Sequence, residues 1–221
     1  GDHRDLHSLR RRQRQMCIRD RERAEKWIPI TYPWDLLKAN ASILADLEER
    51  IEGEVEKGVI IKGKLILEEG AVIKSGTRIE GNVIIGKHSQ IGPNALLRQR
   101  GGIAIGSGCK IGFCVEMINS IVMDNSKIPH LSYVGDSVIG YDCNLGAGTI
   151  TANLRHDGKN VKSLVKGELI DTGLRKLGAI IADGCKTGIN TSFYPGVKMW
   201  PGTWTKPAEV VKKDIIKEPN L

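Results

Sequence analysis

Large aliphatic residues recur every six positions over much of the chain, beginning near Val59. The series runs without a gap through Ile61, Leu67, Ile73, Ile79, Ile85, Ile91, Leu97 and Ile103. A period of six fits neither an α-helix, with its period of 3.6, nor a strand of simple alternation. It is typical of a parallel β-helix, in which each short strand forms one side of a coil and the aliphatic residues stack inward. We therefore expect residues 59–151 to form about five coils of three hexads each.

The six-residue spacing is interrupted at three places. It resumes at Ile111, Met117 and Met123, at Ile139, Leu145 and Thr151, and at Ile181, Thr187, Phe193 and Met199. The segments between these runs cover residues 98–109, 125–137 and 152–179. A structural repeat needs only its inward positions, so we expect the three segments to leave the coil as loops and to carry functional residues.

Residues 33–51, ahead of the repeat, have the spacing of an amphipathic α-helix. Pro33 suits the first turn of a helix, and Gly53 follows its end. The positions expected to face the core are Leu36, Leu37, Ile43, Leu44, Leu47 and Ile51. We therefore expect a connector helix within residues 22–56, packed on a β-helix domain that occupies residues 57–221.

Residues 1–21 differ from the rest of the chain, because they hold seven arginines and no sustained apolar period. A basic arm that touches nucleic acid is one interpretation. Back-translated in one frame, however, all 21 positions match the two ends of a transposase-based sequencing-library adapter, with residues 8–10 in place of its variable index. We therefore interpret the segment as an artefact. It implies that the gene begins upstream of Glu22.

Charge and cysteine content exclude several classes of function. Leaving out residues 1–21, with seven basic and three acidic side chains, lowers the formal net charge from +7 to +3, which gives no argument for nucleic-acid binding. The chain has no signal peptide and no apolar run long enough to span a bilayer, so we expect a cytoplasmic protein with no membrane contact. No CxxC pair is present, which favours reduced thiols over a zinc site at Cys109, Cys114, Cys143 and Cys185.

Candidate chemistry gathers in one part of the sequence. It holds His130, Tyr133, the run Asn144–Thr149, Lys159 and Lys162. Taken alone, His130 is most simply a solvated loop histidine. A tyrosine, asparagines and lysines nearby favour a general base, because imidazole titrates near neutral pH.

The stretch "HLSYVGDSVIGYDCNLGAGTITANLRHDGKNVK", residues 130–162, resembles the acetyltransferase signature of the bifunctional UDP-N-acetylglucosamine pyrophosphorylase / glucosamine-1-phosphate N-acetyltransferases. "LRKLGAIIADGCKTGIN" and "YPWDLLKAN" resemble the archaeal-type branch, and the resemblance spans residues 27–216. It implies an all-β fold, a left-handed parallel β-helix that forms a homotrimer with active sites between subunits. It also implies a preceding nucleotidylyltransferase domain, whose motifs are absent here, so the intact protein is expected to be bifunctional.

The resemblance also implies an activity, with acetyl-CoA as co-substrate and glucosamine-1-phosphate, or galactosamine-1-phosphate, as acceptor. By motif position, His130 is the general base that takes a proton from the attacking amine, and Asn153 holds the amine or the acetyl group in line. Ala147 offers a backbone N–H to the thioester oxygen, and Asn153 and Leu154 join it in contacting the cofactor. The contacts to the sugar phosphate fall to Arg98, Tyr133, Asn144, Lys159 and Lys162.

The chain departs from the family pattern at two positions. Ile118 stands where the family has a lysine that pairs with the sugar phosphate, which predicts weaker substrate binding. The sequence Arg98–Arg100 replaces the family's Arg-Pro-Gly, so Arg100 either takes over the phosphate contact or the loop sits differently.

Two other functions fit a hexapeptide repeat. A non-catalytic assembly or regulatory module needs only the coil, and Ile118 is its best support. A zinc carbonic anhydrase needs histidines at a set spacing, and His88, His130 and His156 lack it. No metal site is expected.

Overall fold

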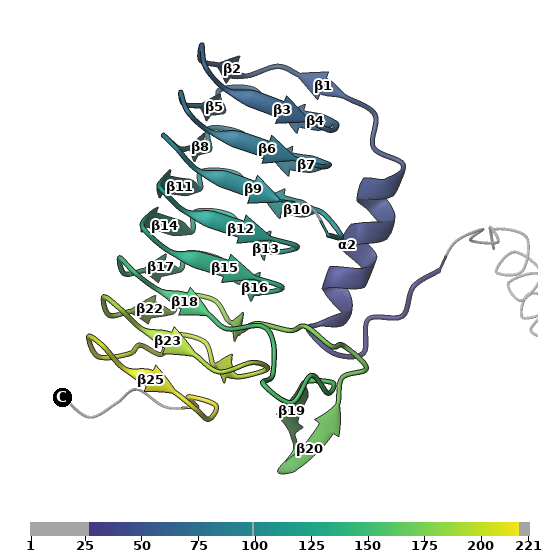
Figure 1. Cartoon of the computed structure of the whole chain (residues 1–221), viewed down its shortest axis with the longest axis vertical. Helices are drawn as coiled ribbons and strands as arrows, with labels where there is room; N and C mark the ends of the chain where they lie inside the picture. The colour runs from purple at the N-terminus through teal and green to yellow at the C-terminus, as the bar shows by residue number, and fades with distance from the viewer. Residues whose placement is uncertain (1–26, 99, 217–221) are drawn as a thin grey trace, which may run out of the picture.

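The computed structural model describes residues 27–98 and 100–216; the segment interpreted as adapter-derived, 1–21, lies outside them. Short parallel strands wind into a three-sided column, with successive strands belonging to successive sides (Figure 1). The sides are sheets of eight, seven and eight strands, named here the first, second and third sheets. The predicted parallel β-helix is confirmed.

The strands are short, as the six-residue period requires. The first sheet holds β1 (Arg50–Ile51), β4 (Leu65–Leu67), β7 (Val83–Ile85), β10 (Ile103–Ile105), β13 (Ile121–Val122), β16 (Val138–Ile139), β21 (Ile180–Ile181) and β24 (Lys198–Met199). The second holds β2 (Glu54–Val55), β5 (Val72–Ile73), β8 (Gln90–Ile91), β11 (Lys110–Phe113), β14 (Lys127–His130), β17 (Asn144–Leu145) and β22 (Lys186–Thr187). The third holds β3 (Ile60–Lys62), β6 (Arg78–Glu80), β9 (Leu96–Arg98), β12 (Glu116–Ile118), β15 (Tyr133–Gly135), β18 (Ile150–Thr151), β23 (Ser192–Phe193) and β25 (Val210–Val211).

The aliphatic positions of the repeat form the core. From Leu67 to Leu97, every predicted inward residue is fully buried, as are Ile111, Met117, Ile139 and Leu145. Met123, also predicted inward, is 37% exposed, and Val122 takes its place in the core. Ile103 is buried, but the residue stacked on Ile85 is Ile105.

Coil length explains these two shifts. Ile60 pairs with Arg78, three hexads on, whereas Ile85 pairs with Ile105, two positions beyond three hexads, and Ile105 pairs with Val122, one position short. Tyr133 pairs with Ile150, also one position short. A coil that is one residue shorter drops that residue at a corner and keeps its inward positions. The prediction that residues 125–137 leave the coil is therefore wrong: they form β14 and β15, and His130 ends a strand instead of lying in a loop.

Of the other two predicted interruptions, that of residues 152–179 is confirmed, whereas residues 98–109 stay largely in the column, because Ile103–Ile105 form β10. The corner after β9 carries two extra residues, because Ile85 pairs with Ile105, two positions beyond three hexads. Residues 152–179 leave the column and form an antiparallel hairpin, β19 (Lys162–Val165) with β20 (Glu168–Asp171) (Figure 1).

The connector helix α2 (Asp35–Ala45) is shorter than the predicted 33–51. Ile51 belongs to β1, so the column begins at Arg50, ahead of the predicted boundary at residue 57. Of the six predicted core positions, Leu37, Leu44 and Leu47 are buried, whereas Ile43 and Ile51 are 66% and 48% exposed.

The helix lies along the corner between the third and first sheets (Figure 1). Asn40 Nδ2 donates to the carbonyl of Gly102 at 3.3 Å, and Asn82 Nδ2 donates to the carbonyl of Leu44 at 2.8 Å. Gly102 has a positive φ of 114°, and a Cβ there would overlap Leu44 Cδ1. This glycine therefore permits both the turn and the close approach of the helix.

Cys109, Cys143 and Cys185 are buried free thiols, and Cys114 is exposed. Burial raises the pKa of all three buried thiols, that of Cys143 to about 11, so they fill space as unreactive groups. Within residues 27–98 and 100–216, no three His, Cys, Asp or Glu side chains cluster as metal ligands would. No helix in the same part of the chain combines the length and the apolar character needed to cross a membrane.

Candidate active site

The motif residues from His130 to Asn153 lie at the two ends of β15. At one end the chain turns from the second sheet into the third, and His130 precedes β15 by three positions. At the other end it turns from the third sheet into the first, and Asp136 follows β15 directly. We name these the histidine corner and the aspartate corner. In Figure 1 they lie to the left and right of β15, with α2 on the right.

The histidine corner is a column of stacked residues. Phe113 pairs with His130 in the register of β11 and β14. The same step along the chain that pairs Lys127 with Asn144 places Ala147 opposite His130. The step from Asn144 to Lys186 places Ile189 opposite Ala147, and the N–H of Asn190 donates to the Ala147 carbonyl at 2.7 Å.

Two polar groups in neighbouring coils of this corner, the His130 imidazole and the Ala147 N–H, have no hydrogen-bond partner in the described part of the chain. The carbonyl of His130 accepts the N–H of Gly148 at 3.3 Å, which holds the backbone of the corner. Its imidazole is exposed and has no hydrogen-bond partner in the described part of the chain, and neither does the Ala147 N–H. A candidate general base at His130 therefore lies one coil from Ala147, whose backbone N–H can stabilise a developing oxyanion. Asn144, exposed on β17, lies three positions before Ala147.

The aspartate corner is a closed polar network. Asp136 is only 3% exposed. Its Oδ1 accepts Asn119 Nδ2 at 2.8 Å, and its Oδ2 accepts Arg100 Nη2 at 2.8 Å and Asn153 Nδ2 at 2.5 Å. Asn153 Nδ2 also donates to the Tyr133 phenol oxygen at 3.0 Å.

Tyr133 connects the two corners across β15. A Cβ on Gly135 would lie 2.6 Å from the Tyr133 hydroxyl and 2.6 Å from Asn153 Nδ2, so only glycine lets the phenol lie over the strand. Burial raises the pKa of the phenol above its ordinary value of 10, and the Asp136 carboxylate raises it further. Tyr133 is therefore a neutral hydroxyl at physiological pH.

Sequence reasoning missed Asp136 and Asn119. The signal was present: positions 119, 136 and 153 are all Asn or Asp, and their even spacing equals the step from Tyr133 to Ile150 between neighbouring coils. It could be recognised only after the shorter coil was known.

The remaining predicted phosphate contacts lie elsewhere. Arg98 forms an ion pair with Glu116, which lies on the neighbouring strand β12 two residues before the register partner of Arg98, with Nε 3.0 Å from Oε1. Arg100 lies in the long corner after β9 and binds Asp136. Ile118 pairs with Arg98 on one side and Gly135 on the other and is 9% exposed, so an apolar side chain fills the position of the family lysine.

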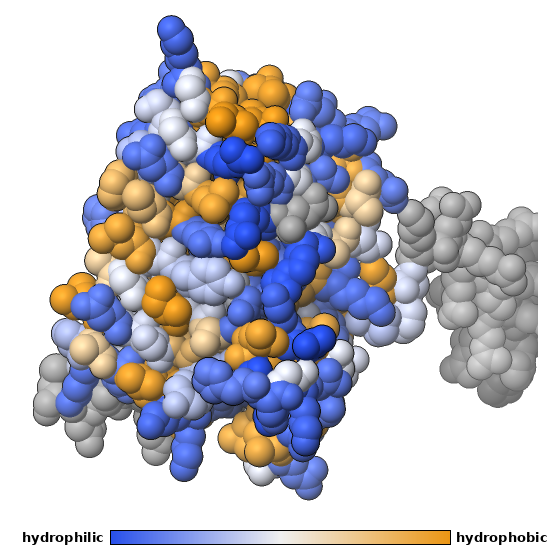
Figure 2. Space-filling model, viewed as in Figure 1, coloured by the Kyte–Doolittle hydropathy of each residue, from blue (hydrophilic) through white to orange (hydrophobic). Residues whose placement is uncertain are grey.

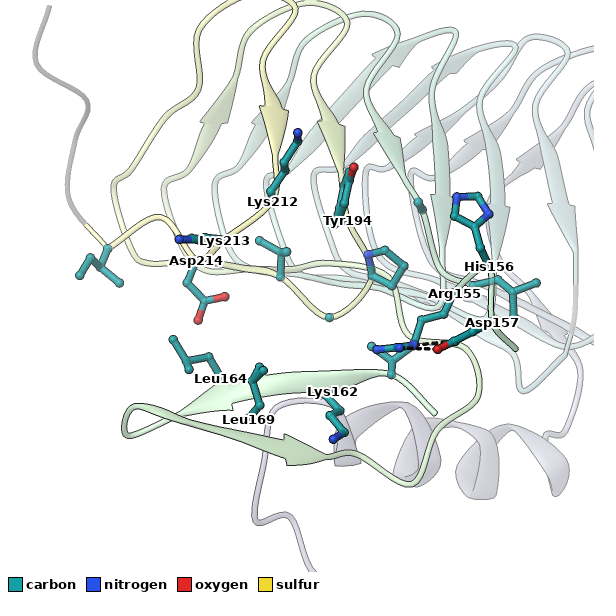
Figure 3. Close-up of a pocket in the computed structure, with 17 residues that line it drawn as sticks. Arg155, His156, Asp157, Lys162, Leu164, Leu169, Tyr194, Lys212, Lys213 and Asp214 are labelled. Carbon is teal, nitrogen blue, oxygen red and sulfur yellow. Dashed lines mark hydrogen bonds and ion pairs between the residues drawn. The ribbon is translucent and has the colours of Figure 1, made fainter. Parts of the chain in front are cut away.

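A groove of about 1040 Å³ separates the β19–β20 hairpin from the last coils (Figure 3). Leu154, which follows Asn153 directly, lines it together with Lys162 and the apolar side chains Leu164 and Leu169. Opposite them lie Tyr194, Lys212 and Lys213 (Figure 3).

The groove carries unpaired positive charge. Its two carboxylates are engaged: Asp157 with Arg155, Nη2 to Oδ2 2.6 Å, and Asp214 with Lys198 at 2.7 Å. The Arg155 hydrogen bonds lower the pKa of Asp157 strongly. In the chain as described, no carboxylate pairs with the groove residues Lys162, Lys212 and Lys213. Lys212 Nζ lies 5.9 Å from the centre of the Tyr194 ring. Lys159 contacts the groove residue Asp157 through its backbone, whose N–H donates to the carboxylate at 3.1 Å.

The structure thus separates most of the predicted residues into three places, with Arg98 apart from them at the end of β9 and Lys159 attached by its N–H to the groove residue Asp157. His130, Ala147 and Asn144 lie at or near the histidine corner, Tyr133 and Asn153 belong to the aspartate corner, and Leu154 and Lys162 line the groove. Within one chain, His130 and Asn153 lie at opposite ends of β15.

No family model matches the chain, but curated relatives do. The protein named "Bifunctional protein GlmU" of Methanocaldococcus jannaschii is 47% identical over 189 residues, which cover 86% of this chain and 46% of the relative. The "Bifunctional sugar-1-phosphate nucleotidylyltransferase/acetyltransferase" of Sulfurisphaera tokodaii is 50% identical over 190 residues, 86% of this chain and 47% of the relative. The chain spans about half the length of these relatives and matches their C-terminal part.

The chain is also similar, at low identity, to solved structures. The polySia-specific acetyltransferase NeuO covers 75% of this chain and 78% of its own, with a TM-score of 0.44 and 17% identity. A putative acetyltransferase of Bacillus cereus covers 68% and 76%, with a TM-score of 0.39 and 18% identity.

Proposed function

The chain belongs to the family of bifunctional GlmU proteins and sugar-1-phosphate nucleotidylyltransferase/acetyltransferases, matching about half their length, and on that premise we propose that it transfers the acetyl group of acetyl-CoA to the amine of glucosamine-1-phosphate. Galactosamine-1-phosphate is a second acceptor. The nucleotidylyltransferase activity that the relatives' names describe belongs, in this proposal, to the half that the match does not span.

The proposal depends above all on the histidine corner, where the His130 imidazole and the Ala147 N–H, from register neighbours, both lack a hydrogen-bond partner in the described part of the chain. The substrate amine, in its neutral form, attacks the thioester carbonyl, and its nitrogen bonds to the acetyl carbon. His130 takes the proton that this nitrogen loses. The Ala147 N–H stabilises the negative charge on the carbonyl oxygen. The C–S bond then breaks, and His130 returns the proton to the sulfur of coenzyme A.

The groove provides a place for the acyl donor. Coenzyme A carries phosphates on a nucleotide and an apolar arm, and the groove offers three unpaired lysines beside leucine side chains. Because Leu154 follows Asn153 in the chain, a donor lying in the groove extends toward the aspartate corner. We propose that Lys159 and Lys162 lie between the acyl donor and the amino sugar and contact the sugar phosphate.

We propose that acetyl-CoA and the amino sugar react at the contact between two copies of the chain in a homotrimer. The histidine corner exposes large apolar side chains: Phe113 is 43%, Leu131 59%, Ile150 38% and Ile189 54% exposed. Leu131 has φ +48°, an uncommon conformation for a leucine, which turns it outward. Figure 2 shows hydrophobic residues exposed toward the left of this view, the side on which Figure 1 labels the second sheet. A neighbouring copy that covers them brings its aspartate corner to His130.

A non-catalytic assembly module is the second candidate, favoured by the burial of Ile118 where the family lysine is expected. Isothermal titration of the purified chain with acetyl-CoA distinguishes the two, because a bare scaffold gives no heat of binding. Coenzyme A release on adding glucosamine-1-phosphate supports the enzyme. Binding of neither compound, with the chain folded, overturns it.

A further inference from the structure

The residues Asn119, Asp136 and Asn153 form a ladder along the aspartate corner, one residue from each of three consecutive coils. Asn119 and Asp136 have positive φ angles of 44° and 47°, which Asn and Asp tolerate better than most residues. The backbone holds the middle rung, because the Asp136 N–H donates to the Ile118 carbonyl at 2.8 Å and its carbonyl accepts the Gly178 N–H at 2.8 Å.

The carboxylate of Asp136 is the centre of this ladder. It receives an amide N–H on each side, from Asn119 and from Asn153, and Arg100 supplies the compensating charge. A buried carboxylate is retained only when it is paired and hydrogen-bonded in this way. Arg100 therefore has a structural partner and is not free for a phosphate.

The carboxylate decides which way the Asn153 amide faces. An ionised carboxylate can only accept hydrogen bonds, so the amide must present its nitrogen to Asp136. That nitrogen donates one hydrogen to Asp136 and the other to the Tyr133 oxygen. Both N–H groups are thus used, and Oδ1 of Asn153 has no donor in the described part of the chain.

We propose that Asp136 is a positioning residue that locks the Asn153 amide with Oδ1 outward, as an acceptor for the amine of an amino-sugar phosphate. An amine presents several N–H donors to a fixed carbonyl oxygen, and an ammonium adds charge to the contact. The opposite amide orientation would present N–H groups, which repel an ammonium. A hydroxyl can also donate to Oδ1, but it carries no charge and has a single donor. The orientation therefore favours a 2-amino group, bound as the ammonium, over a 2-hydroxy group. This inference rests on the proposed function.

The test compares binding of glucosamine-1-phosphate and glucose-1-phosphate by calorimetry. Asp136→Asn keeps the shape and tolerates the positive φ, but it offers one carbonyl oxygen to two amides and a guanidinium. We expect the preference for the amine over the hydroxyl to fall about tenfold, because a charge-assisted hydrogen bond is lost. Affinity for glucose-1-phosphate stays within about twofold, so a general weakening of both sugars, as a purely structural role predicts, overturns the proposal.

Two control variants separate positioning from loss of the ladder. Asn119→Gly tolerates the positive φ and removes only the other rung, so it keeps the amine preference. Asp124→Asn changes a carboxylate that accepts the Ser107 N–H at 2.8 Å on another corner, and it also keeps the preference. An equal loss of preference in Asn119→Gly and Asp136→Asn overturns the proposal.

The native chain supplies the reference and a second measurement. If it binds neither sugar phosphate, the proposed function fails; if it binds the amine and Asp136→Asn keeps the preference, only the positioning role fails. If Asp136→Asn does not fold, the structure of the native chain with glucosamine-1-phosphate decides. The amine nitrogen within hydrogen-bonding distance of Asn153 Oδ1 supports the proposal, and Asn153 Nδ2 on the ligand overturns it.

Discussion

The two ends of β15 differ in almost every physical respect. At the histidine corner the imidazole and the Ala147 N–H are unpaired in the described chain, and Phe113, Leu131 and Ile189 expose apolar surface. At the aspartate corner the carboxylate is buried, and both of its oxygens accept hydrogen bonds. One corner leaves a base, a donor and apolar surface without partners, whereas the polar groups of the other are already paired. The difference fits the proposed function, in which the histidine corner carries the reaction and the aspartate corner holds the acceptor.

The largest expected effect comes from removing the base. His130→Ala should lower the rate of acetyl transfer about 10²- to 10⁴-fold, the range for loss of a general base. The matched control is His88→Asn, an exposed histidine with φ +57° in an earlier coil, where Asn tolerates the conformation. Coenzyme A release at saturating substrates measures the rate. Near-native turnover of His130→Ala would contradict the assignment of the general base to the histidine corner.

The next largest effect tests whether the histidine corner needs a neighbour. In Leu131→Asp, the new aspartate tolerates the positive φ but places a charge in the expected contact between copies. Assembly and activity should therefore be lost together. Ile43→Asp, at a comparably exposed isoleucine on α2, should change neither. Light scattering after size-exclusion chromatography gives the mass. An active Leu131→Asp monomer would show that no second copy is required.

A smaller effect is expected from disturbing the aspartate corner without removing any polar group. Gly135→Ala places a methyl 2.6 Å from the Tyr133 hydroxyl and from Asn153 Nδ2. The phenol and the amide must move, and we expect kcat/KM for the amino sugar to fall about tenfold. Circular dichroism should show the fold unchanged, because Gly135 has no positive φ. Unchanged kinetics would show that the phenol need not lie over the strand.

The smallest effect tests whether the third sheet, between the two corners, contributes to binding of the sugar phosphate. Ile118→Lys restores the family residue, whose stem can lie along the apolar surface while the ammonium reaches outward. We expect KM for the sugar phosphate to fall about threefold, since an exposed ion pair contributes little. A rise in KM with unchanged kcat would show that the phosphate binds elsewhere.

The core of the column could be predicted from the sequence because its requirement is simple: every sixth residue must be aliphatic, and Leu67 through Leu97 obey without exception. The site could be predicted only in part. A coil one position short of three hexads resembles an interruption when three full hexads are expected, so the sequence pattern places β14 and β15 in a loop. The shorter coil also hides the ladder of Asn119, Asp136 and Asn153. These residues are recognised as neighbours only once the pairing register of the strands is known.

The hairpin groove shows a second limit of sequence reasoning. The sequence correctly predicts that segment 152–179 leaves the coil, since the inward pattern stops there. Nothing in its composition shows that it folds back to place Lys162 opposite Lys212 and Lys213, which lie much later in the chain.

Complementation between two inactive variants tests most directly whether an active site joins the histidine corner of one copy to the aspartate corner of another. His130→Ala and Asn153→Ala are each expected to be nearly inactive as pure proteins, with unchanged assembly. Co-expressed at equal levels, they should form mixed trimers in which about a quarter of the interfaces pair an intact His130 with an intact Asn153. Recovery of about a quarter of native coenzyme A release supports the account, and activity no higher than that of either variant alone contradicts it.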